Sequence, residues 1–245
     1  KDFRNEGMDR NHNPEFTMLE FYWAYADYKD CMYLVESLIR NVAKKIDSLE
    51  IAFNNVKIDL NKPFKKKKFS ALLSEKLGVN VDDISENQLK KICKEKQIQV
   101  KSDANIGQIL DALMGELVEP TLTEPTFVID YPKVISPLAK MHRSGDPKLV
   151  ERFELFIGGD EFANSFSELN DPIDQRKRLE EQASFKKLGD DEAQVIDENF
   201  IQAMECGMPP TGGVGIGIDR LVMLLTENNS IKDVILFPAL RTETV

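Results

Sequence analysis

The sequence predicts an α+β fold: an antiparallel sheet flanked by helices, with a helical insertion. Segments that read as strands lie near the start of the chain and again over residues 126–169. Helical patterns, with apolar residues three and four positions apart, are grouped over residues 60–119 and after residue 172. Strands and helices are therefore segregated rather than alternating, which is typical of α+β proteins.

The first thirty residues predict a β-hairpin. Phe3 to Glu6 and Glu15 to Tyr25 have the composition of strands, and residues 7–14 between them are rich in turn formers. From Asp30 to Ile46 the apolar residues recur at intervals of three and four. This spacing predicts an amphipathic helix that packs on the core.

Residues 60–119 differ in character from the rest of the chain. They contain the lysine run Lys65 to Lys68, followed by helical patterns over residues 70–77, 87–96 and 104–117. We interpret them as a helical insertion within a domain that spans residues 1–245.

The sheet is expected to resume after this insertion. Thr126 to Asp130 reads as a strand, and Arg152 to Phe156 and Phe162 to Leu169 read as two more, joined at Gly158-Gly159. Helices are expected over residues 172–188 and 191–206, and Gly212 to Ile218 is expected to open the last strand and helix.

Composition limits the class of protein. The net charge of -10 disfavours nonspecific binding to a polyanion but does not exclude binding through a local basic patch. No apolar run is long enough for a membrane span. Cys31, Cys93 and Cys206 lie far apart without a CxxC pair, so we expect neither disulfides nor structural zinc, and a cytoplasmic location. The chain starts at Lys1 without a leader, and we interpret it as a segment of a longer protein.

The predicted hairpin carries an unusual set of polar residues. A period of two puts Arg4 and Glu6 on one strand face, and it gathers Phe16, Met18, Glu20 and Tyr22 on one face of the partner strand. His12 lies in the loop between the strands. Unpaired buried charge is costly, so this face is expected to bind a charged, planar ligand.

The same segment resembles motif 2 of class II aminoacyl-tRNA synthetases. Residues 12–20, HNPEFTMLE, followed by Tyr25-Ala26-Asp27, are similar to the lysine-specific members. Residues 213–221 with 236–241 resemble motif 3, and residues 154–171 resemble the strands that bind metal and amino acid. The resemblance covers the chain from motif 2 to motif 3 and implies the class II catalytic fold.

The resemblance implies an ATP site. Arg4 would hold the α-phosphate and the lysine carboxylate, Glu6 the adenine amino group, and Phe16 and Arg220 the two faces of adenine. His12 and Asn13 would lie near the outer phosphates. Arg4 and Arg220 would be the catalytic residues, since a planar guanidinium both forks onto phosphate and stacks on a ring.

Two carboxylates flank the Gly158-Gly159 turn. Glu154 and Glu161 would face each other across a hairpin and, by the resemblance, bind Mg²⁺ that contacts ATP. An ordinary pair of surface carboxylates is the alternative.

The resemblance also implies a lysine site, in which Glu168 and Tyr22 meet the ε-ammonium. The expected lysine-binding residues are Glu20, Tyr22, Asn164, Phe166, Glu168 and Gly215. Strict alternation would put Glu161 on the opposite strand face from Asn164, so we expect a bulge or turn between them. A buried carboxylate that awaits an ammonium rejects neutral amino acids, because it would stay desolvated and unpaired.

The implied function is that of a lysine–tRNA ligase, which forms lysyl-adenylate from lysine and ATP and transfers lysine to tRNA(Lys). One alternative is the paralogue that attaches lysine to an elongation factor, and Gly215 and residues 25–27 disfavour it. A second is a non-catalytic regulator, which the retained site residues disfavour. An aspartyl or asparaginyl enzyme is a third, and Glu168 would repel aspartate.

Other family features are expected outside this chain. The anticodon-binding domain, motif 1 and much of the interface of a homodimer would precede Lys1. The lysines at 65–68 are typical of a solvated face, and contact with the tRNA acceptor arm is the alternative.

Overall fold

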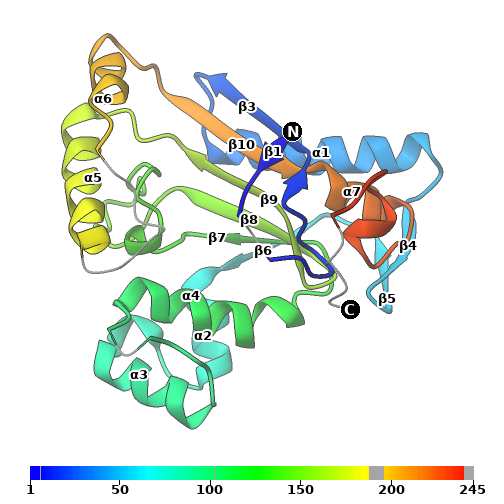
Figure 1. Cartoon of the computed structure of the whole chain (residues 1–245), viewed down its shortest axis with the longest axis horizontal. Coiled ribbons are helices and arrows are strands. Elements are labelled where there is room, and N and C mark those ends of the chain that lie inside the picture. Colours follow the sequence, from blue (N-terminus) through cyan, green and yellow to red (C-terminus); the bar gives the residue numbers. More distant parts are fainter. Residues whose placement is uncertain (6, 102, 188–195, 240–245) are drawn as a thin grey trace, which may run out of the picture.

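The computed structural model describes residues 1–5, 7–101, 103–187 and 196–239, with the backbone alone for residues 184–187. Within these ranges no helix is long and apolar enough to cross a membrane. The predicted α+β class is confirmed by a six-stranded sheet with helices on its faces (Figure 1).

The sheet is antiparallel except at one edge. Its strands, in spatial order, are β3 (Met18–Ala24), β10 (Thr211–Gly217), β9 (Asp160–Ser167), β8 (Arg152–Ile157), β7 (Thr126–Ile129) and β6 (Lys65–Lys68). Only β6 and β7 are parallel. The lysine run is thus an edge strand with all four residues exposed, and the helical part of residues 60–119 begins at Phe69. Exposed lysines are typical of sheet edges because they discourage pairing with other chains.

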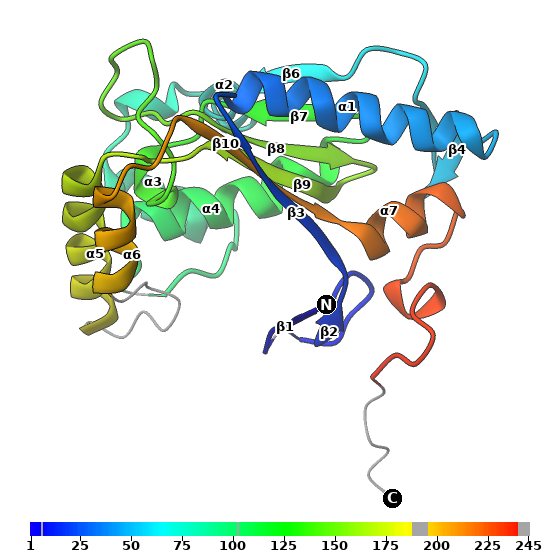
Figure 2. The same cartoon turned by 90° about the horizontal axis from the view of Figure 1, so that it is seen from above.

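The N-terminal hairpin is divided into two parts. β1 (Asp2–Phe3) pairs with β2 (Glu15–Phe16), whereas β3 starts after Thr17 and joins the main sheet. The chain turns there because the Thr17 amide donates to Asp219 Oδ2 at 2.6 Å and its carbonyl accepts from the Ile218 amide at 3.0 Å. The predicted hairpin is therefore confirmed only for β1 and β2, which form a short ribbon that stands off the end of the sheet (Figure 2). The strand expected over residues 3–6 ends at Phe3, and residues 18–24, expected in the same hairpin, pair with β10 instead.

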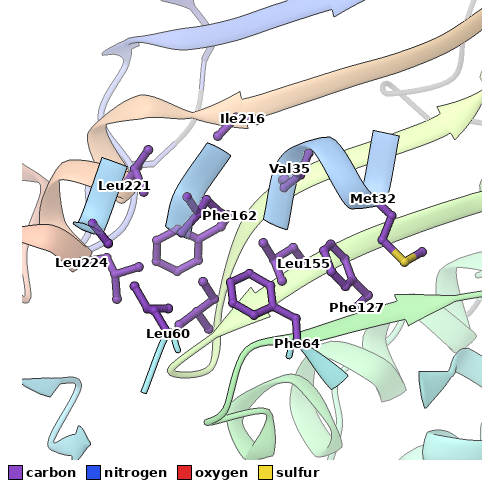
Figure 3. Close-up of a cluster of buried hydrophobic side chains, with 14 of the residues drawn as sticks. Met32, Val35, Leu60, Phe64, Phe127, Leu155, Phe162, Ile216, Leu221 and Leu224 are labelled. Atoms are coloured by element: carbon purple, nitrogen blue, oxygen red, sulfur yellow. The ribbon is translucent and has the colours of Figure 1, made fainter. Parts of the chain in front are cut away.

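One face of the sheet is covered by α1 (Tyr28–Lys45), close to the predicted 30–46. Asp27 caps this helix with a complete capping box. Figure 3 shows Met32 and Val35 of α1 next to Leu155 and Phe127 of the sheet, and all four are buried. This cluster is the main core.

A hairpin that the sequence reading did not include lies after α1. It consists of β4 (Glu50–Phe53) and β5 (Val56–Asp59). Its turn residues Asn54 and Asn55 have φ of 50° and 63°, values that asparagine tolerates better than most residues. Phe53 anchors the hairpin in the core against Phe162, with ring centroids 5.9 Å apart.

A helical block covers the opposite sheet face at the β7–β8 end. Its helices, near the predicted ranges, are α2 (Phe69–Leu77), α3 (Glu86–Glu95) and α4 (Ile106–Leu117). They form a second core with Val128 and Phe156, which point away from the α1 side because strand side chains alternate. The same face of β3, β10 and β9 carries no helix of this block.

The remaining helices frame this open face. They are α5 (Pro172–Lys187), α6 (Glu198–Glu205) and α7 (Ile218–Leu225). The 3₁₀ turns are η1 (Val81–Asp83) and η3 (Lys133–Ile135), which lie against α2 and α4 of the helical block, and η2 (Glu119–Thr121) and η4 (Ile231–Asp233). The first part of the helix expected over residues 191–206 lies outside the described residues. Within the described part, α6 begins at Glu198 and ends at Glu205, one residue before the expected end. As predicted, α7 follows the last strand directly.

The bulge expected between Glu161 and Asn164 is present. Leu155 pairs with Ala163 while Phe156 pairs with Glu161, so Phe162 is the extra residue on β9. It brings Glu161 and Asn164 to the same strand face, where both line the cavity described next.

Candidate active site

A cavity of about 450 Å³ opens over β3, β10 and β9. It is lined by all but two of the site residues that the sequence predicts: Arg4, His12, Asn13, Phe16, Glu20, Tyr22, Glu161, Asn164, Phe166, Glu168, Gly215 and Arg220. Glu6 lies outside the described residues, and Glu154 is not among the residues that line the cavity.

The floor of the cavity is the central strand β10. Gly213 pairs with Tyr22 on one side and Phe166 on the other, and Gly215 pairs with Glu20 and Asn164. Neither glycine has a side chain, and neighbouring side chains occupy the space above both: Glu168 and Tyr22 at Gly213, and Met18 and Glu20 at Gly215.

The acid end of the cavity consists of Glu168 and Tyr22. The Glu168 amide donates to the Thr211 carbonyl at 2.8 Å, which fixes the backbone next to β10. Burial raises the pKa of the Glu168 carboxyl to about 8. No ion pair to this carboxylate is present within the described residues. The charge of Glu168 and, less strongly, burial raise the pKa of Tyr22 as well.

The arginine end of the cavity consists of Arg4 and Arg220. Arg220 Nη1 donates to the Glu161 carbonyl at 2.7 Å, and its Nη2 lies 3.2 Å from His12 Nε2. The Arg4 guanidinium lies 5.4 Å from the ring centroid of Phe16. Two guanidinium groups and a flat ring therefore meet at this end, a combination suited to a planar anion.

The loop over residues 7–14 is tied to the β8–β9 turn through one carboxylate. Asp160 accepts from Arg10 at 3.0 Å, from Asn11 at 2.7 Å and from Asn54 at 2.8 Å. Since Asp160 is 8% exposed, these bonds are shielded and hold the loop, with His12, over the cavity.

Asn13 has a structural position in this loop. It is 2% exposed, its Nδ2 donates to the Glu15 carbonyl at 2.6 Å, and its Oδ1 accepts from the Ala239 amide at 3.2 Å. Both ends of the amide are thus used within the protein.

Three carboxylates approach one another beside the arginine end. Burial and then the charge of Glu154 raise the pKa of Glu161 to about 7. Glu154 accepts hydrogen bonds from Tyr131 Oη, at 2.6 Å, and from Arg152. In the described part of the chain no group of three or more acidic, histidine or cysteine side chains is arranged to hold a metal ion.

Glu119 is the third carboxylate, and the sequence reading missed it. Burial, then Glu154 and Glu161, raise its pKa to about 7. It comes from η2, which the turn amides of Gly158 and Gly159 hold through the carbonyls of Thr123 and Leu122. A carboxylate before Pro120 is its only signal in the sequence, and nothing local indicates this tertiary contact.

Nearly the whole chain is similar to known proteins. The family model described as tRNA synthetases class II (D, K and N) matches residues 1–241. A lysine–tRNA ligase of Deinococcus radiodurans is 51% identical over 243 residues, which cover 98% of this chain and 46% of that protein.

Lysine–tRNA ligases of other organisms give similar matches. The lysine–tRNA ligase of Gloeobacter violaceus is 53% identical, covering 98% of this chain and 49% of its own. The lysine–tRNA ligase of Saccharolobus solfataricus is 49% identical, and the match covers 100% of this chain and 50% of that protein. The chain spans about half the length of the curated relatives it matches.

Proposed function

Because this chain belongs to the class II tRNA synthetases of the D, K and N group, we propose that it is the catalytic part of a lysine–tRNA ligase. The protein would activate lysine with ATP and transfer it to the 3′ end of tRNA(Lys). The relatives named above carry this activity in their names.

The observation that carries the choice of lysine is the Glu168 carboxylate at the acid end. A desolvated carboxyl with a raised pKa is stabilised in its charged form by a cation that enters the cavity. An aspartate side chain would be repelled, and an asparagine side chain brings no charge. Of the three amino acids in the family description, lysine alone brings a side-chain ammonium.

The proposed reaction has two steps. The lysine carboxylate attacks the α-phosphorus of ATP, which gives lysyl-adenylate and releases pyrophosphate. A ribose hydroxyl of tRNA then attacks the adenylate carbonyl, forming the ester and releasing AMP. The attacking groups belong to the substrates, so the protein contributes alignment and charge stabilisation.

The arginine end has the groups for this alignment. Arg4 would fork onto the α-phosphate and the lysine carboxylate, and the ring of Phe16 and the plane of Arg220 would hold adenine between them. His12, beside Arg220, would face the outer phosphates.

Glu154 and Glu161 have hard oxygen donors that suit Mg²⁺. Their mutual repulsion, seen in the raised pKa of Glu161, is relieved by a divalent cation. Magnesium keeps several waters and needs few protein ligands, so two carboxylates suffice together with phosphates. When bound, it would neutralise phosphate charge during adenylate formation.

The whole protein has further proposed features. We expect an anticodon-binding domain and motif 1 in the part of the relatives that this chain does not span, and a homodimer. Residues 60–119 are proposed as an insertion in the catalytic domain. Cys31, Cys93 and Cys206 are free thiols, which is consistent with the proposed cytoplasmic location.

The proposed function is tested by pyrophosphate exchange into ATP with each of the twenty amino acids. Exchange should depend on lysine and fall by at least a hundredfold in Arg4→Ala. The control is Arg176→Ala, because the ion pair that Arg176 forms with Glu198 lies at the exposed surface. Exchange driven equally by aspartate or asparagine, or unchanged in Arg4→Ala, would refute the assignment.

A further inference from the structure

We infer that Gly213 is a specificity-determining residue of the amino-acid pocket, because its missing side chain reserves the space that the Glu168 carboxylate occupies. The inference rests on the proposed function. Gly213 touches no reacting atom, so it acts by positioning Glu168 rather than as a catalytic residue.

The contact at Gly213 is too close for any side chain. A Cβ at this position would lie 1.8 Å from Glu168 Oε1 and 3.0 Å from Glu168 Cδ. It would also lie 3.1 Å from Tyr22 Cε1. The carboxylate therefore fills the place of a side chain at residue 213, and even alanine would displace it.

The backbone at Gly213 has no need of glycine. Its φ is not positive, unlike that of Gly158 or Gly207, so an alanine would be free of backbone strain. The atom it meets is the end of a flexible side chain, which can rotate away. An alanine should thus be accepted by the fold and still move the carboxylate.

The neighbouring Gly212 has the opposite role. A Cβ there would lie 2.4 Å from the Sγ of buried Cys31 and 3.2 Å from the Asp27 carbonyl, at the start of α1. These atoms belong to the packed core and to the helix backbone, which cannot rotate away. Gly212 is therefore required by the fold, whereas Gly213 is required by the site.

The position of the carboxylate matters because it meets a charged group. A charge-assisted hydrogen bond depends steeply on distance, and misplacement by about 1 Å costs roughly a hundredfold in a positioned site. If the Glu168 carboxylate moved away from its position beside Tyr22, it would bind an ammonium poorly. Affinity for lysine should fall about ten- to a hundredfold, while the arginine end keeps its affinity for ATP.

A double-mutant cycle of Gly213→Ala and Glu168→Asp tests this inference, with lysine and ATP affinities from calorimetry and Tm for each variant. In the Glu168 background, Gly213→Ala should weaken lysine binding about ten- to a hundredfold and leave the Kd for ATP unchanged. In the Glu168→Asp background it should cost less than about threefold, because the shorter side chain withdraws the atoms that the Cβ meets.

Two glycine variants serve as controls. Gly115→Ala in α4 has no atom within 4 Å of the new Cβ and should change no affinity, whereas Gly212→Ala should lower Tm. Normal lysine affinity in a folded Gly213→Ala protein, or additive losses in the cycle, would overturn the inference. So would a loss of Tm on Gly213→Ala that is equal in both backgrounds. If the wild-type protein itself does not bind lysine, the proposed function fails first.

Discussion

The two ends of the cavity are built in different ways. At the arginine end, Arg220 is held by the Glu161 carbonyl and His12, and Arg4 lies over Phe16. At the acid end, Glu168 has no ion pair within the described residues, and burial raises its pKa to about 8. One end is ordered by its own contacts before any ligand arrives. At the acid end, the charged form of a desolvated carboxyl is stabilised by a cation. We therefore expect this end to determine which amino acid binds.

The largest effect should come from removing the charge at the acid end. Glu168→Gln keeps the size of the side chain but cannot pair with an ammonium, so kcat/KM for lysine in pyrophosphate exchange should fall roughly a hundred- to a thousandfold. The KM for ATP should change less than about threefold, because the arginine end is intact. The control is Glu205→Gln on the exposed side of α6. Equal losses for lysine and ATP would show that the two ends are not independent.

A second effect follows from the pKa of Glu168. Its folded-state pKa of about 8 lies above the ordinary value of 4.5, so its contribution to stability is fully present below pH 4.5 and is lost as pH rises through 8. Under the proposed function, lysine binding needs the ionised carboxylate, and lysine keeps its side-chain ammonium in this range. Its affinity should therefore rise by up to about tenfold per pH unit between pH 6 and 8.

Calorimetry in buffers of different ionisation enthalpy measures this linkage. At pH 7, lysine binding to the wild-type protein should release protons. Glu168→Gln should abolish that release, which separates Glu168 from Glu161 and Glu119, whose pKa values are also raised to about 7. Proton release that is the same in both proteins would assign the titration to another group.

The smallest effect should come from a conservative change at the arginine end. Arg220→Lys keeps the charge but loses the planar group that donates to the Glu161 carbonyl and faces the cavity. The KM for ATP should rise about tenfold, with lysine affinity unchanged in the absence of ATP. The matched control, Arg176→Lys, alters an exposed pair and should have no effect. A lysine affinity that falls together with ATP affinity would contradict the separation of the two ends.

Much of the fold was predictable because its signals are local. The period of α1, the strand alternation of β8 and β9 and the glycines between them correspond to structure that neighbouring residues determine. Even the bulge at Phe162 followed from the requirement that Glu161 and Asn164 share a face. The strand at Lys65–Lys68 was not predictable, because lysine has a low strand propensity and the strand forms through pairing with β7. The break at Thr17 depends on Asp219, 202 residues away.

The candidate site likewise has residues that the sequence predicted and residues that only tertiary contacts bring to it. Motif spacing brought Arg4, Phe16, Glu168 and Arg220 to one cavity, as the resemblance implied. Tertiary contacts supplied the rest: η2 brings Glu119 beside Glu161, and Tyr131 and Arg152 engage Glu154. The tight contact between Gly213 and Glu168 also depends on strand register, which a glycine-rich run does not reveal.

The most direct test of charge selection at the acid end compares lysine with norleucine, whose side chain has the same four carbons as lysine but lacks the terminal ammonium. Calorimetry should show that wild-type protein binds lysine at least a hundredfold more tightly than norleucine, and that Glu168→Gln reduces this ratio to within about tenfold. An undiminished preference for lysine in Glu168→Gln would contradict the account, because another group would then recognise the ammonium.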